Sequence, residues 1–296
     1  MGYNTLQDKL VKTFFIIVVG TFGIFCLFPL WMMLMASFTD ENYLIREGYN
    51  IFIPKFDIIA YKLTFASSEV LSSYGITILV TASGVFLTLL LTSSIAYPLT
   101  VKTLRYRNII SLFAYITMLF GGGLVPTYIL FVRYLHLYNN IWVLIIPGAL
   151  SAYNMYLMMN YFRTIPESLS ESAKIDGANE VYIYLKIILP LSKPILATIA
   201  LFAAMGYWNE WFRVMLYIDN PHLYTLQYLL LRLQRQADFL NSELGSKAMK
   251  GGVQISVPSY TIRMATAMIS IGPIVLLYPF LQKYFMKGIM IGAIKG

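Results

Sequence analysis

The chain has 296 residues, of which 58% are hydrophobic and only 12% are charged, and its net charge is +8. A soluble globular chain carries about 25% charged residues, so this composition excludes an ordinary soluble domain and predicts an all-α polytopic membrane protein in a lipid bilayer. A single cysteine and two distant histidines exclude a disulfide framework and a metal site, and basic residues scattered between apolar runs argue against nucleic-acid binding.

Six long apolar runs predict six transmembrane helices, because about 20 mostly apolar residues cross a bilayer. The expected spans are about 13–37, 72–100, 108–132, 140–162, 188–211 and 262–283. The first run is longer than the apolar core of a signal peptide, and no small-x-small cleavage pattern follows it. We therefore expect a retained helix that contains Pro29, and a fifth span in which Lys193 reaches the interface.

The distribution of lysine and arginine predicts the orientation of these spans. With a cytoplasmic N-terminus, the inner segments would hold 12 of the 22 basic residues and five of the 14 acidic residues. The short 102–107 connection is purely basic in its charged residues. Both termini are therefore expected in the cytoplasm, with a long inner loop at 163–187 and a long outer loop at 213–261.

The inner loop has the pattern of a short amphipathic helix followed by a turn. Pro166 and Glu167 suit the start of a helix, and Gly177 is expected to stop or bend it. A second amphipathic stretch, with Val181, Tyr184, Leu185 and Ile188 on one face, leads to Pro190. Composition alone would make such a helix an interfacial packing element.

The spacing of particular residues in this loop is more specific than its composition. Glu171-Ser-Ala is followed after three residues by Gly177 and, after nine more, by Ile187-x-Leu189-Pro190. This resembles the EAA motif of ABC-importer permeases, with Ser172 in place of the first alanine, and Asp176-Gly-Ala resembles the form found in sugar importers. Residues 163–187 are called the EAA loop below. The resemblance assigns ATPase coupling to Glu171, Ser172, Ala173, Asp176, Gly177, Ala178, Leu189 and Pro190.

Three further segments are similar to carbohydrate permeases of this family, in particular to the smaller permease of maltose importers. They are Gly206-Tyr-Trp-Asn-Glu-Trp211, the tail 278–288 with the terminal Lys295-Gly296, and Gly121-Gly-Gly-Leu-Val-Pro126. The last is similar to the complex-oligosaccharide branch, which includes algino-oligosaccharide importers.

The resemblance implies a single permease domain, 1–296, with the type I ABC-importer fold in a bacterial cytoplasmic membrane. It implies a second, different permease subunit, two ATPase subunits and an extracytoplasmic sugar-binding protein as partners. No P-loop pattern occurs, so this chain is not expected to be an enzyme or to hold a cofactor or metal. ATP and magnesium would bind to the ATPase subunits.

Aromatic and polar side chains gather at the predicted outer end of the fifth span, where they could bind a sugar. These candidates for the substrate pathway, called the aromatic stretch below, are Tyr207, Trp208, Asn209, Glu210 and Trp211. Interfacial anchoring explains the tryptophans equally well, whereas Glu210 needs either a cavity or an ion pair with Arg213.

Two alternatives remain open for parts of this interpretation. The outer loop resembles one that probes the binding protein in the maltose importer, or it is a simple lid. A secondary, ion-coupled transporter is the alternative function, although no internal repeat and no carboxylate in the middle of a span supports it. The sequence contains no cluster of residues that would indicate a membrane enzyme.

Overall fold

The structure is a computed structural model that describes residues 6–66, 68–240 and 260–273. The regular secondary structure of these residues consists of helices, joined by turns and loops, and one isolated β-bridge between Thr39 and Phe56. The chain divides into two compact units, one with Met1–Ser68 and Arg232–Ile271 and the other with Glu69–Leu231 and Gly272–Gly296. The residues predicted to carry function all lie in the second unit. The tail 278–288, most of the outer loop after residue 240 and the last part of the predicted span 262–283 lie outside the described residues.

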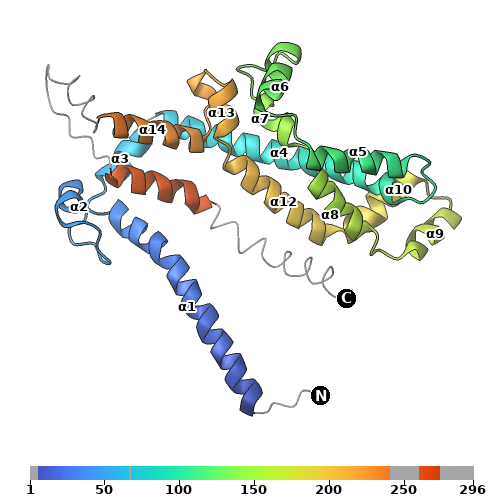
Figure 1. The fold of residues 1–296 in the computed structure, drawn as a ribbon, viewed down its shortest axis with the longest axis horizontal. Helices are drawn as coiled ribbons and strands as arrows, with labels where there is room; N and C mark the ends of the chain where they lie inside the picture. Colours follow the sequence, from blue (N-terminus) through green and yellow to red (C-terminus); the bar gives the residue numbers. More distant parts are fainter. Residues whose placement is uncertain (1–5, 67, 241–259, 274–296) are drawn as a thin grey trace. The chain divides into compact units, whose positions relative to one another are not determined.

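The first unit contains α1 (Leu6–Ser37), with Pro29 inside it as expected, and two short helices, α2 (Glu41–Glu47) and α3 (Ile59–Ala66) (Figure 1). It also contains a helix at 260–271, which continues to 273. The Glu41 carboxylate caps this helix, since it accepts hydrogen bonds from the backbone N–H groups of Tyr260 (3.0 Å) and Thr261 (2.8 Å). A carboxylate at a helix N-terminus is favourable because it meets unsatisfied N–H groups.

The second unit is built on one long helix, α4 (Ser68–Thr100), and a series of shorter ones (Figure 1). These are α5 (Arg107–Leu119), α6 (Leu124–Ile129), the π-helix η1 (Leu130–Tyr134), α7 (Trp142–Ile145), the 3₁₀-helix η2 (Ile146–Gly148), α8 (Ala152–Phe162), α9 (Glu167–Ile175), α10 (Glu180–Ile183), the π-helix η3 (Tyr184–Ile188), α11 (Leu189–Leu191), α12 (Lys193–Trp208), α13 (Phe212–Tyr217) and the 3₁₀-helix η4 (Pro221–Leu223). Helix α14 (Leu226–Leu240) begins in this unit.

Two of the described helices are long and apolar enough to cross a membrane unbroken, within Lys9–Ser37 and Ser68–Thr100. Three other predicted spans are each a pair of helices with a bend, by 114° between α5 and α6–η1, by 47° between α7–η2 and α8, and by 78° between α10–α11 and α12. The described residues therefore supply up to five spans, and six spans with cytoplasmic termini stay a prediction.

Each bend has a local cause in the backbone. Phe120 leaves the helix in an extended conformation, and Gly123 has φ +82°, which favours glycine. Ser151 is extended before α8. Ser192 ends α11, and Pro194, which has no N–H to donate, sits in the first turn of α12.

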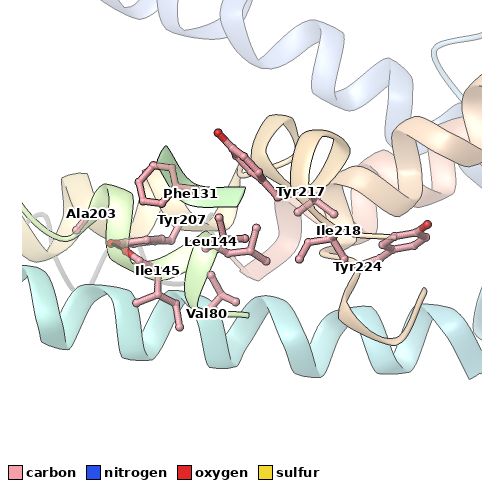
Figure 2. Close-up of a cluster of buried hydrophobic side chains, with 11 residues drawn as sticks. Val80, Phe131, Leu144, Ile145, Ala203, Tyr207, Tyr217, Ile218 and Tyr224 are labelled. Atoms are coloured by element: carbon pink, nitrogen blue, oxygen red, sulfur yellow. Dashed lines mark hydrogen bonds between the residues drawn. The ribbon is translucent and has the colours of Figure 1, made fainter. Parts of the chain in front are cut away.

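Two clusters of buried side chains hold the second unit together. One joins α4, α7 and α12 around Val80, Leu144 and Tyr207 (Figure 2). The other joins α4, α8 and the η3 region around Tyr97, Met158 and Ile183. The second cluster lies against the EAA loop, so this loop is anchored on the core at one side.

Candidate functional site

Helix α9 ends in a complete Schellman motif. The N–H of Ala178 donates to the carbonyl of Ala173 (2.9 Å) and the N–H of Gly177 donates to that of Lys174 (3.0 Å). Gly177 has φ +83°, the left-handed conformation that this motif requires at its penultimate position. The fixed spacing from Ala173 to Gly177 is therefore the spacing of a helix stop, and the helix ends before Gly177 as the sequence predicts.

The next helix, α10, begins at Glu180, directly after a side-chain cap at Asn179. The Asn179 side chain accepts a hydrogen bond from the backbone N–H of Tyr182 (2.8 Å), which is the usual arrangement at a helix N-terminus. Glycine and asparagine thus turn the chain from α9 into α10, with four residues between the two helices. This turn is fixed by backbone geometry and does not depend on packing alone.

Glu180, the first residue of α10, links the turn to α9 and to α4. Its carboxylate forms an ion pair with Lys174 (2.7 Å) and accepts a hydrogen bond from the Tyr97 hydroxyl (2.7 Å). The Tyr97 ring also stacks on Tyr184, with centroids 5.2 Å apart, and the Tyr184 hydroxyl shares a hydrogen bond with Ser93 (2.7 Å). The EAA loop is therefore attached to the end of α4 at two points.

The buried face of the second stretch differs from the predicted one. Ile183 and Ile188 are buried, whereas Val181 and Leu185, which the sequence assigned to the apolar side of this amphipathic stretch, are 64% and 49% exposed. For Leu185 the reason is the π-helix η3 (Tyr184–Ile188), in which the N–H of Leu189 donates to the carbonyl of Tyr184 five residues earlier. One extra residue per turn shifts the buried face, and single π-turns are frequent at functional sites.

Helix α9 itself buries no side chain completely. Ile175 is 87% exposed and Leu169 is 43% exposed, so two apolar side chains on this helix are open to a partner. Glu171, Ser172 and Asp176 are exposed as well, and Ala173 and Ala178 pack partly on the core. Farther along, Leu189 is half-buried and Pro190 is exposed.

Four residues of α9, Glu167, Ser170, Glu171 and Lys174, form one wall of a pocket of about 450 Å³. The other walls are the end of α4, the 101–106 segment, the beginning of α5 and the end of α8, and Glu171 is among the lining residues. Lys102 and Glu167 pair across this pocket at 2.7 Å. The EAA loop therefore borders a pocket with charged residues in its walls, while Ile175 and Leu169 are exposed.

The aromatic stretch lies differently, because it is largely folded into the chain's own core. Tyr207 is buried, and its hydroxyl donates to the carbonyl of Ile145 (2.8 Å) (Figure 2). The backbone passes so close to its ring that a Cβ at Gly84 would lie 2.5 Å from it, and one at Gly148 would lie 3.0 Å from the hydroxyl. Tyr207 thus fills a socket that two glycines form.

The neighbours of Tyr207 are a mixture of buried and exposed side chains. Trp208 is buried and meets Tyr74 edge-on at 6.4 Å. Asn209 is exposed and donates to the carbonyl of Met205 (2.8 Å), whereas Trp211 is 40% exposed. These two exposed side chains are the members of the stretch that a ligand could reach directly.

Glu210 forms the ion pair with Arg213 that the sequence offered as its structural role. The side chains meet at 2.8 Å, and the same carboxylate accepts a hydrogen bond from the Arg213 backbone N–H (2.9 Å). The Glu210 carbonyl also accepts a hydrogen bond from Thr225 (2.6 Å). Its charge is compensated within the chain, and the pathway role of the whole stretch stays a prediction.

Sequence reasoning missed the residues that hold the loop. Tyr97 and Ser93 lie inside a long apolar run, where nothing marks them as partners of a charged loop. Asn179 could have been found, because asparagine before a glutamate and an apolar stretch is a helix-start signal. Within the described residues, no three His, Cys, Asp or Glu side chains group as a metal site would require.

Comparison with known proteins gives matches over the whole chain. It is 36% identical over 294 residues to "Protein LplC" of Bacillus subtilis, covering 99% of this chain and 98% of that protein. It is 35% identical over 293 residues to the "Polygalacturonan/rhamnogalacturonan transport system permease protein YtcP" of the same organism, covering 99% of both.

A solved structure matches too. It is a chain in the crystal structure of a bacterial ABC transporter involved in the import of the acidic polysaccharide alginate, with a TM-score of 0.82 and 30% identity over 96% of this chain and 100% of that one. The family model described as "Binding-protein-dependent transport system inner membrane component" matches residues 1–291. The chain therefore belongs to the family of inner membrane components of binding-protein-dependent transport systems.

Proposed function

We propose that this chain is a permease subunit of an ATP-driven importer for a sugar or oligosaccharide, and that its EAA loop couples transport to ATP hydrolysis on partner subunits. The observation that carries the proposal is the EAA loop itself. The Schellman motif fixes the turn after α9, and α9 presents the exposed apolar side chains of Ile175 and Leu169. On the other side of the turn, Glu180 is hydrogen-bonded to Tyr97 of α4. The names of the relatives, which include polygalacturonan and arabinooligosaccharide permeases, support a saccharide substrate.

In this proposal α9 docks on an ATPase subunit beneath the membrane. Ile175 supplies apolar contact. Glu171, which is exposed at the rim of the pocket, supplies a charge for a basic or amide group. A flexible connector would absorb the movement of the ATPase, whereas a helix closed by a Schellman motif transmits it. The Lys174–Glu180–Tyr97 contacts offer a second route into α4, beside the direct continuation through η3 into α12.

The proposal includes the assembly around this chain. A second, different permease subunit completes the translocation path, two ATPase subunits bind at the cytoplasmic side and a sugar-binding protein docks outside. The chain would cross the bacterial cytoplasmic membrane six times with both termini inside. ATP and magnesium belong to the ATPase subunits, and nothing in the described residues favours the ion-coupled alternative.

We also propose that the exposed part of the aromatic stretch lines the sugar pathway. Trp211→Ala would remove a ring that is 40% exposed, and the importer should still assemble. Sugar uptake by the reconstituted importer should nevertheless slow. Unchanged uptake in Trp211→Ala and in Asn209→Ala would leave the stretch with a structural role alone.

The coupling proposal is tested by ATPase activity of the purified importer with and without liganded binding protein. Gly177→Val should abolish the stimulation, because an L residue in the left-handed region costs roughly 1–2 kcal/mol and a β-branched one more. Gly177→Asn is the matched control, since asparagine tolerates this conformation, and it should retain part of the stimulation. Full stimulation and a normal subunit ratio in Gly177→Val would refute the proposal.

A further inference from the structure

The pocket behind α9 contains more positive charge than its own carboxylates compensate. Four of its lining residues form two ion pairs, Lys102 with Glu167 and Lys174 with Glu180, each at 2.7 Å. Within each pair, the positive and the negative charge compensate each other. The charge that remains comes from the other ionisable residues of the lining.

Those residues are Arg107, Arg163 and Glu171. Within the described part of the chain neither arginine forms an ion pair. Two guanidinium groups and one carboxylate leave a positive balance in a pocket of about 450 Å³, a volume in the range of ligand sites. Guanidinium groups bind phosphate oxygens through paired N–H donors, so the pocket is suited to a phosphate.

The beginning of α5 increases this preference for an anion. Arg107 and Asn108, its first two residues, line the pocket. The cap residue Tyr106 makes no side-chain hydrogen bond, and the first turn contains no acidic residue. The N-terminal N–H groups and the helix dipole therefore add to the positive potential that the two arginines create.

The same helix explains why the anion would belong to a lipid. Helix α5 buries none of its side chains in the chain, and Ile109, Leu112 and Phe113 are 65%, 57% and 70% exposed. This apolar surface begins directly after the pocket-lining arginine and continues along a predicted span. A free phosphate would use only the pocket, whereas a phospholipid would use the pocket and the apolar side chains beside it.

We propose that this pocket binds the phosphate headgroup of an anionic phospholipid of the cytoplasmic leaflet, with its acyl chains along α5. Arg107 and Arg163 bind the phosphate oxygens. The acyl chains cover Ile109 and Phe113. The bound lipid would thereby support the wall of the pocket that α9 shares.

The experiment uses the complete importer in phosphatidylcholine nanodiscs that contain either photoreactive phosphatidylglycerol or photoreactive phosphatidylcholine. Labelling of the peptide that contains residues 107–119 is measured by mass spectrometry. Phosphatidylglycerol should label it more strongly. Each of Arg107→Gln and Arg163→Gln should lower this preference about fivefold, which corresponds to about 1 kcal/mol per basic residue at an anionic surface.

Arg105→Gln is the matched control, because Arg105 lies in the same connection but over the Tyr106 ring, at 5.5 Å, and does not line the pocket. It should leave the preference unchanged, and Arg107→Lys, which keeps the charge if Arg107→Gln fails to assemble, should keep most of it. Equal labelling by the two lipids, or an equal loss in Arg105→Gln, would overturn the proposal. Competition by soluble glycerol phosphate that removes the labelling would assign the pocket to a free anion and overturn the lipid assignment.

Discussion

The EAA loop and the aromatic stretch both stand out in the sequence, yet the chain treats them in opposite ways. The loop has a turn that backbone hydrogen bonds define, and Ile175 on its helix is 87% exposed. The stretch has its most prominent members in the core, with Tyr207 in a socket between two glycines and Glu210 paired with Arg213. A segment whose shape is fixed but whose side chains are open is suited to a partner, whereas a segment whose polar groups are satisfied internally holds the chain together.

Among the substitutions that test this comparison, replacement of Ile175 should have the largest effect, on binding of the ATPase subunits. Burial of an isoleucine is worth about 1.5–3 kcal/mol, so Ile175→Ser should weaken binding of the ATPase subunits about tenfold or more. The chain should fold normally, because the side chain is 87% exposed. The amount of ATPase that copurifies with the permease measures the effect.

Phe52→Ser is the control for that experiment, since Phe52 is an apolar side chain of similar exposure, 77%, in the other unit. It should leave the subunit ratio unchanged. A normal ratio in Ile175→Ser would mean that the open apolar side chain of α9 has no partner on the ATPase.

A substitution at Gly84 tests whether Tyr207 of the aromatic stretch helps to hold the core together. A Cβ there would lie 2.5 Å from the Tyr207 ring, and overpacking of a core costs typically about 1–3 kcal/mol. Gly84→Ala should therefore lower the thermal unfolding midpoint of the assembled importer. Gly75→Ala, in the same helix with nothing within 4 Å of its Cβ, should leave the midpoint equal or slightly higher.

Loss of the Tyr97 hydroxyl should have a smaller effect, confined to the loop. Tyr97→Phe keeps the ring on Tyr184 but removes the hydrogen bond to Glu180. Such a bond to a charged group contributes about 1.5–3 kcal/mol at most. Stimulated ATPase activity should fall in part while the subunits stay together. Tyr106→Phe, at a 56% exposed tyrosine of the adjoining connection, should change nothing, and equal activity in both variants would contradict the second route into α4.

The smallest expected effect concerns pH and the beginning of α2, where the carboxylate of Asp40 caps the helix. The backbone N–H of Tyr43 and the ammonium of Lys55 hold the pKa of Asp40 below its ordinary value of 3.8. Because the folded pKa is lowered, this stabilisation of α2 is complete above the ordinary pKa and is lost as the pH falls through the lowered one. Hydrogen exchange of the α2 amides, corrected for intrinsic rates, should accelerate there, whereas Asp40→Asn should abolish this pH dependence.

Local backbone chemistry could be predicted from the sequence. Gly177 predicted the end of α9, and Pro29 was correctly placed inside α1. These features depend on residues close together in the chain. The family was also evident from the EAA spacing, which the family model and the relatives confirm.

The bends and the anchors could not be predicted in the same way. Counting apolar residues records the length of a segment but not its dihedral angles, so the break at Phe120–Gly123 was counted as part of one span. The buried face of η3 was misplaced because the period of 3.6 fails in a π-helix. Tyr97 and Glu180 are 83 residues apart, and only the fold brings them together.

A cross-link from α9 to the ATPase would test the central claim most directly. Cys26 is the only cysteine of the chain, so a Cys26→Ser background allows a single new cysteine by Ile175→Cys. In the assembled importer, a short bifunctional reagent that joins this cysteine to lysines should connect the permease to an ATPase subunit, and Phe52→Cys should not react in this way. A cross-link from Ile175→Cys to the ATPase is the predicted result, and its absence from an intact, ATP-hydrolysing complex would contradict docking through α9.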